Sequence, residues 1–274
     1  MRHAGPWSIA LLLLAPAASA HAFDPTPGGE VAHGARIGRV LGCAGCHAAD
    51  LTGNDWSEAG FIRMRSANLT RSAARYTPAE LATMIRSGRR SDGRVLWQMP
   101  SHLFTRLTAA EMAALVAWMR SHKPAGPIAP APVLLAGARK EIAAGLFRSA
   151  AAEVAVQGRA MPPAAGPGHA QARHIVRATC AECHGMDLRG GTPYPGATPR
   201  PDLRLVAAYP PADFARLLKT GIATGGREVG LMSQVARSRY SHLTAAEVTA
   251  VRAYLVALAA QDMTTRAPAE TGAP

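Results

Sequence analysis

Aromatic side chains are scarce in this sequence of 274 residues, at 5% of the total. Because aromatic residues bury more area each than other side chains, they would fill two cores of ordinary size poorly. Either the cores are unusually small, or a large flat group other than a side chain fills them. At 48% hydrophobic and 18% charged residues, the chain is still too apolar to be disordered throughout.

Cysteine and acidic residues are also few. Four Cys in so long a chain exclude a dense disulfide framework. Asp and Glu number 18 against 30 Lys and Arg, which gives a formal net charge of +12. The excess is spread evenly, since residues 30–122 and 169–260 each carry +5 and residues 123–168 carry +3. The sequence has no basic cluster of the kind that binds nucleic acid. The net positive charge suits docking to an acidic partner, although an arginine-rich genome would explain it equally well.

Long hydrophobic runs are absent after the N-terminus. Arg2 precedes an apolar run over residues 7–14, and an A-x-A cleavage pattern ends at Ala20. This predicts a secretory signal peptide over residues 1–20, with Ala22 as a second cleavage position. Because the run is too short to cross a bilayer, we expect a protein of the bacterial periplasm with no membrane span.

All four cysteines fall into two copies of a C-x-x-C-H motif. Cys43, Cys46 and His47 form the first copy, and Cys180, Cys183 and His184 form the second. C-x-x-C-H is the attachment motif for haem c. Two thiols about one helical turn apart add to the two vinyl groups of one haem, and the adjacent imidazole ligates the iron. The motifs therefore predict two covalently bound haem c groups.

Three other interpretations of the cysteines compete with haem attachment. Two C-x-x-C pairs could supply four thiolates to zinc, but the two adjacent histidines would then be unexplained. A thioredoxin-like redox pair would need a βαβ pattern, which surrounds neither motif. Two disulfides are compatible with an oxidising compartment.

The two motifs belong to an internal repeat. The second motif follows the first at a shift of 137 residues. Residues 76–81 match residues 209–214 at a shift of 133, and residues 107–111 match residues 243–247 at a shift of 136. The shift changes only between the matching segments, which indicates one fold used twice.

Each copy is expected to be all-α, with three main helices around one haem. The first helix, over residues 31–42 and again over residues 170–179, leads into the haem motif. The second helix starts at a proline and ends at a glycine in both copies, and the third opens with a Thr-Ala-Ala-Glu capping box. These signals are Pro78, Gly88, Pro211, Gly221 and the segments 108–111 and 244–247.

The repeat also predicts the domain layout. One or two short helices are expected within residues 133–157, packed on the haem domains rather than on a membrane or a partner. The segments are a signal peptide (1–20), a first domain (30–122), a linker (123–168), a second domain (169–260) and a disordered tail (261–274).

With these motifs in place, the sequence resembles a diheme c-type cytochrome built from two class I cytochrome c domains. The resemblance rests on the two C-x-x-C-H motifs, on Met99-Pro100, and on closing helices that end in Trp118 or Tyr254. It resembles in particular two-domain bacterial cytochromes that serve periplasmic dehydrogenases, such as the cytochrome subunits of alcohol and sugar-acid dehydrogenases. Those subunits usually carry a third C-x-x-C-H motif, which this sequence lacks.

The resemblance implies a Met thioether opposite each His, in the loop before the last helix. Met99 and Met232 are the Met pair that coincides in the repeat at a fixed shift, so we predict them as axial ligands beside His47 and His184. Met186 follows His184 by two residues and is therefore expected on the same side of the haem as that histidine. Core packing is the expected role of the methionines on apolar helix faces, which are Met84, Met112 and Met119.

Two arginines align just before the Met positions. The guanidinium forks of Arg94 and Arg227 suit carboxylates, so these residues are candidates for contacts with haem propionates; a solvated loop position is the alternative. His33, His169 and His174 lie beside the first helices, and we expect them on the surface.

The ligand set implied by the resemblance points to a function. Two thioethers, a His and a Met leave no open position on the iron, and Met ligation raises the reduction potential. We therefore expect an electron carrier rather than an enzyme, taking electrons from a periplasmic dehydrogenase and passing them to another cytochrome or a terminal oxidase. The alternative is a diheme redox enzyme, a peroxidase or thiosulfate dehydrogenase, in which one haem has an open or non-Met sixth position.

Overall fold

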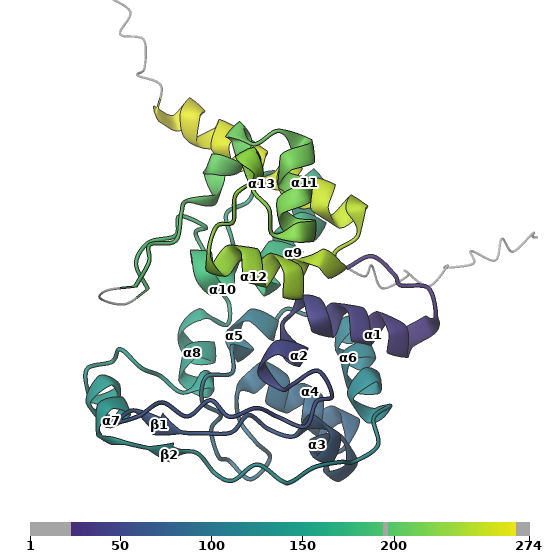
Figure 1. The fold of residues 1–274 in the computed structure, drawn as a ribbon, viewed down its shortest axis with the longest axis vertical. Helices are drawn as coiled ribbons and strands as arrows, with labels where there is room; N and C mark the ends of the chain where they lie inside the picture. Colours follow the sequence, from purple (N-terminus) through teal and green to yellow (C-terminus); the bar gives the residue numbers. More distant parts are fainter. Residues whose placement is uncertain (1–22, 194–196, 267–274) are drawn as a thin grey trace, which may run out of the picture.

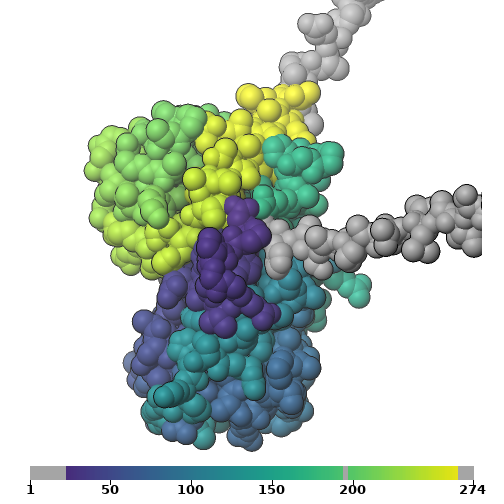
Figure 2. All heavy atoms as spheres, turned by 90° about the vertical axis from the view of Figure 1, so that its right-hand side faces the viewer, coloured from purple at the N-terminus to yellow at the C-terminus, as the bar shows by residue number. Residues whose placement is uncertain are grey.

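The computed structural model describes residues 23–193 and 197–266 (Figure 1). The expected signal peptide over residues 1–20 lies outside the described residues. The chain forms two helical lobes, one for each repeat, and Figure 2 shows the N-terminal segment lying across the boundary between them. Among the described residues, no helix is long and apolar enough to span a bilayer.

The two repeats fold into similar sets of helices, which confirms the all-α class. The first contains α1 (Gly29–Val40), α2 (Cys43–Cys46), α3 (Leu69–Arg75), α4 (Pro78–Ser87), α5 (Ser101–Phe104) and α6 (Ala109–Arg120). The second contains η1 (Pro167–His169), α9 (Ala170–Ala178), α10 (Ala181–His184), η2 (Leu203–Ala208), α11 (Pro211–Thr220), η3 (Thr224–Gly226), α12 (Leu231–Ser238), η4 (Tyr240–His242) and α13 (Ala245–Arg266).

The helix ends follow the sequence signals. Helix α4 begins with Pro78 and ends at Gly88, whose φ of 65° is the left-handed conformation that glycine adopts readily. Helix α11 likewise begins with Pro211 and ends at Gly221, with a φ of 78°. Helix α6 opens with the expected capping box, in which Thr108 and Glu111 bind each other's backbone N–H groups.

Two segments differ from the sequence prediction. Residues 261–266, expected to be disordered, continue α13, while residues 267–274 lie outside the described residues. Helix α12 occupies most of the segment between Met232 and Tyr240, which we expected to be a loop. The second copy has three more residues between Met232 and Tyr240 than the first has between Met99 and Phe104. They form helical turns, because Ser233 fixes the start of α12: it is 0% exposed, and its hydroxyl accepts from the N–H of Val229 and donates to the carbonyl of Gly221.

The linker packs on the first domain. Strand β2 (Val133–Leu134) pairs antiparallel with β1 (Ile62–Arg63). Helix α7 (Ala136–Ala143) follows β2, and α8 (Ala150–Gln157) packs on α4 and α5. These two short helices fall within the segment where the sequence indicated one or two.

The first and last helices of the first domain cross at very short range. An added Cβ at Gly34 in α1 would lie 1.8 Å from the carbonyl oxygen of Ala114 in α6. At Gly38, one turn later, it would lie 2.3 Å from the indole ring of Trp118. The crossing therefore requires glycine at both positions. It packs α1, which leads into the first C-x-x-C-H motif, against α6, the last helix of the domain.

Two buried glutamates, one from each domain, join the domains. In the first turn of α6, Glu111 accepts from Thr108 N–H, and its Oε2 lies 3.1 Å from Nε2 of His174 in α9. In the first turn of α13, Glu247 is bound by both terminal nitrogens of Arg36 in α1, at 2.7 and 3.0 Å. Both carboxylates are 0% exposed. Each helix cap therefore also makes a charged contact across the interface.

The segment at residues 23–24 runs between these two caps. The N–H of Phe23 donates to Oε1 of Glu111 at 3.1 Å, and the N–H of Asp24 donates to Oε1 of Glu247 at 2.8 Å. The phenyl ring of Phe23 is fully buried. The first described residues therefore bind both domains at once, as their position in Figure 2 indicates.

Two histidines expected on the surface lie elsewhere. His174 contacts Glu111 across the interface. His33 is 5% exposed, and its Nδ1 lies 3.1 Å from the hydroxyl of Thr26. The surface expectation was wrong for both, because the first domain covers His174 through Glu111 and the segment before α1 covers His33 through Thr26, and the position of a residue beside a helix reveals neither contact.

Arg177 in α9 is a further charge buried at the interface, at 1% exposure. Its guanidinium donates to backbone carbonyls of α5 and of the linker and to one hydroxyl: Leu103, His102, Gly158, Ala160 and Thr105. A residue of the second domain thus satisfies carbonyls of the first domain and of the linker together.

Replacing Gly34 by Ala is expected to destabilise the first domain. An exposed helical Gly→Ala change would gain about 1 kcal/mol from helix propensity. Forcing α1 and α6 apart costs about 1–3 kcal/mol or more, so the free energy of unfolding should fall. Gly168→Ala is the control, because its Cβ would meet nothing within 4 Å. Denaturant unfolding of both variants measures the difference; equal stability would contradict the close crossing.

Acid is expected to weaken the interface through Glu111. Burial alone would raise the pKa of Glu111, but the hydrogen bond and charge of His174 and two backbone N–H donors lower it from 4.5 to about 2. A depressed folded-state pKa contributes stability above the unfolded value, which is lost as pH falls from about 4.5 towards 2. The loss should be on the order of 3 kcal/mol. Glu111→Gln should be less stable at neutral pH and should lack this acid dependence in denaturant unfolding; an unchanged acid dependence would contradict the assignment.

Candidate haem sites

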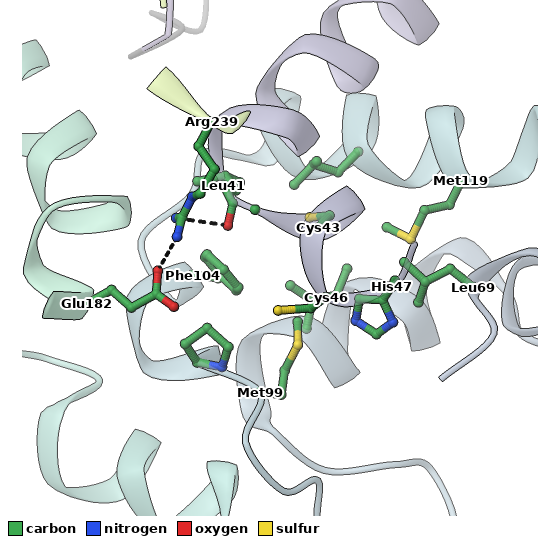
Figure 3. Close-up of a pocket in the computed structure, with 14 residues that line it drawn as sticks. Leu41, Cys43, Cys46, His47, Leu69, Met99, Phe104, Met119, Glu182 and Arg239 are labelled. Carbon is green, nitrogen blue, oxygen red and sulfur yellow. Dashed lines mark hydrogen bonds and ion pairs between the residues drawn. The ribbon is translucent and has the colours of Figure 1, made fainter. Parts of the chain in front are cut away.

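A largely apolar cavity opens beside the first C-x-x-C-H motif (Figure 3). It is lined by Cys43, Cys46 and His47 together with Met99. The apolar part of its wall comes from α3 to α6 and the end of α1, through Leu41, Leu69, Ile85, Phe104, Leu115 and Met119. The structure thus brings four of the predicted site residues of the first domain to one cavity.

The imidazole of His47 is fixed by the backbone. Its Nδ1 lies 2.7 Å from the carbonyl oxygen of Ala67, so the proton is on Nδ1 and Nε2 is left to bind a metal. The side chain is 8% exposed, and burial lowers its pKa. A neutral ring with a free Nε2 is the form in which histidine ligates iron.

The second domain repeats this arrangement. His184 is 7% exposed, and its Nδ1 lies 2.9 Å from the carbonyl oxygen of Pro201. Burial lowers the pKa of His184 as well. Because Ala67 and Pro201 are equivalent in the repeat, both domains hold the ring with the same nitrogen free.

Two methionines line the cavity of the first domain. Met99 comes from the segment before α5, and Figure 3 shows it beside Cys46 and His47. Met119, which the sequence assigned to core packing, projects from α6 into the same cavity and is 3% exposed. In the second domain Met232 lies in the first turn of α12, half-buried against the core.

The cysteines are all free thiols. Burial raises the pKa of Cys43 to about 12 and also raises that of Cys180. Within the described part of the chain, no three His, Cys, Asp or Glu side chains come close enough to hold a metal ion. The zinc and disulfide interpretations therefore find no support, whereas free thiols beside an apolar cavity suit covalent attachment of haem.

The predicted arginines lie away from the cavity. Arg94 is exposed, and its guanidinium binds the carboxylate of Asp92 at 2.6 Å. Arg227 is exposed in the loop before α12. Neither residue lines the cavity of the first domain. A role with propionates stays a prediction for both.

Four residues of the site were missed from the sequence. The carbonyls of Ala67 and Pro201 could have been found, since these residues directly precede Asn68 and Asp202, which match in the repeat at a shift of 134. Arg239 and Glu182 of the second domain also line the cavity of the first. No pattern within one repeat signals a wall supplied by the other repeat.

The residues present fit haem c. The thiols, the oriented imidazole and a thioether converge on an apolar space, and the second motif repeats the histidine geometry. The comparison with curated proteins returns no match. The sequence description of the family Cytochrome c matches twice, at residues 31–123 and 169–259, so that each match contains one C-x-x-C-H motif and together they cover most of the chain. The chain belongs to the cytochrome c family.

Proposed function

We propose that this protein is a periplasmic diheme electron carrier. The observation that supports this most is the repeated histidine: in both motifs Nδ1 is held by a backbone carbonyl and Nε2 is free. The proposed thioether tethers are Cys43, Cys46, Cys180 and Cys183, and the proposed axial ligands are His47 with Met99 and His184 with Met232. Bound haem c supplies reversible one-electron chemistry between ferric and ferrous iron.

The protein's own residues set the conditions for that chemistry. The carbonyls of Ala67 and Pro201 hold each imidazole in one orientation, so little rearrangement accompanies oxidation or reduction. In the first domain the apolar side chains that line the cavity would keep water away from a bound haem, and a Met ligand would raise its reduction potential. These features favour electron transfer over binding of peroxide or oxygen.

The proposed donor is a periplasmic dehydrogenase, and the proposed acceptor is a further cytochrome or a terminal oxidase. The positive charge of both domains supports docking to an acidic surface on one of them. Reduction by such a donor should slow as ionic strength rises, because salt screens the attraction; a rate insensitive to salt would count against acidic docking.

The function is tested on the full chain matured with haem. The denatured protein should keep a covalently bound chromophore, and reductive titration should consume two electrons per chain. The alternative, a diheme peroxidase or thiosulfate dehydrogenase, predicts cyanide binding or turnover at one haem. Cyanide binding by the resting protein, or turnover with peroxide or thiosulfate, would contradict the carrier function.

The Met ligands are tested by the near-red absorption band of the ferric protein, which reports the iron–Met bond. Met99→Ala and Met232→Ala should each reduce the band to about half, because each removes one of two such bonds. Met119→Leu and Met186→Leu are the matched controls and should retain it. Loss of the band in a control variant instead would move the ligand assignment to that residue.

A further inference from the structure

Arg239 lies between the two haem sites. It follows α12 in the second domain, and its side chain, 14% exposed, reaches the first domain and lines the cavity beside Cys43 and Cys46 (Figure 3). Its Nε and Nη2 donate to the carbonyls of Val40 and Leu41, both at 3.1 Å. These carbonyls end α1, directly before the first motif.

The remaining nitrogen of the guanidinium faces the second motif. Nη1 lies 2.6 Å from Oε2 of Glu182, which stands between Cys180 and Cys183 in the sequence. Glu182 also lines the cavity of the first domain. One planar side chain therefore joins the segment that leads into the first motif to a side chain within the second.

Arg239 therefore faces both attachment segments. It lines the cavity together with Cys43 and Cys46, and its Nη1 binds Glu182, which lies between Cys180 and Cys183 in the sequence. The two attachment segments face each other across one cation.

The packing around Arg239 is tight. Gly42, the residue before Cys43, has a φ of 85°, and a Cβ there would lie 3.0 Å from Cζ and Nε of Arg239. The guanidinium thus lies directly against the backbone that begins the first motif. A change in the position of Arg239 would move that backbone or open a gap between the motifs.

We propose that Arg239 is a positioning residue for electron exchange between the two haem sites, a role that rests on the proposed carrier function. By holding the end of α1 and Glu182 at one planar group, it sets the separation and orientation of the two attachment segments. The exchange moves one electron from a ferrous to a ferric centre, with no bond formed or broken and no proton released. The positive charge also favours the reduced state of the adjoining site and so raises its reduction potential.

The test uses the full chain carrying both haems. Arg239→Ala should slow exchange about tenfold or more, because small displacements are costly, and should lower at least one reduction potential, because Glu182 loses its partner. Arg239→Lys should leave the reduction potentials unchanged, because the positive charge is kept. It should still slow the electron exchange, since an ammonium group cannot hold three acceptors in one plane. Redox titration measures the potentials, and laser-driven injection of one electron measures the exchange.

Two control variants distinguish positioning from general stability. Arg237→Ala removes an exposed arginine near the end of α12 that pairs with Glu228 in the preceding loop, and it should change neither quantity. Arg36→Ala removes the Glu247 contact, which joins the domains away from both attachment segments, so it should slow the exchange less than Arg239→Ala does. Unchanged rate and potentials in Arg239→Ala, or an equal slowing in Arg36→Ala, would overturn the proposal. Failure of the carrier function is detected separately, because the unsubstituted protein would then bind cyanide or turn over substrate.

Discussion

The buried carboxylates of Glu111 and Glu247 are the interactions on which the two-domain structure depends. Each satisfies free backbone N–H groups at the start of its own closing helix and contacts a basic side chain of the other domain. An ionised carboxylate without partners would be very costly in a fully buried position. The closing helix of each domain is therefore completed only when the other domain is in place, so folding within the domains and docking between them are coupled.

This coupling explains why the haem motifs lie where they do. Helix α1 provides Arg36 to the cap of α13, and its C-terminal end provides the carbonyls that Arg239 binds. The helix that leads into the first motif is thus held by the second domain near its middle and at its C-terminal end. Arg177 of α9 binds α5 and so adds a further contact between the domains. The relative position of the two C-x-x-C-H motifs therefore depends on these helices.

The sequence predicted well what depends on local signals and poorly what depends on the interface. Pro78, Gly88 and the Thr108 capping box placed the helices correctly, because propensity and capping act within one turn. The repeat also predicted equivalent positions for His47 and His184, and the structure buries both. It could not reveal that His174 and Arg239 contact the other domain, since these contacts join residues 63 and 198 positions or more apart in sequence. Helix α12 was missed because it has no counterpart of equal length in the first repeat.

The interface contains more buried charge than stability alone would favour. Buried ion pairs gain little net free energy over well-packed apolar residues, because desolvation offsets their attraction. Their directional contacts do select one arrangement, since Arg36, Arg177 and Arg239 each lose at least two hydrogen bonds if the domains rotate. The proposed electron exchange between two sites depends on a fixed separation more than on a strong interface. Three of the arginines behind the formal +12 are used in this way inside the molecule, which leaves less of that charge for docking to a partner.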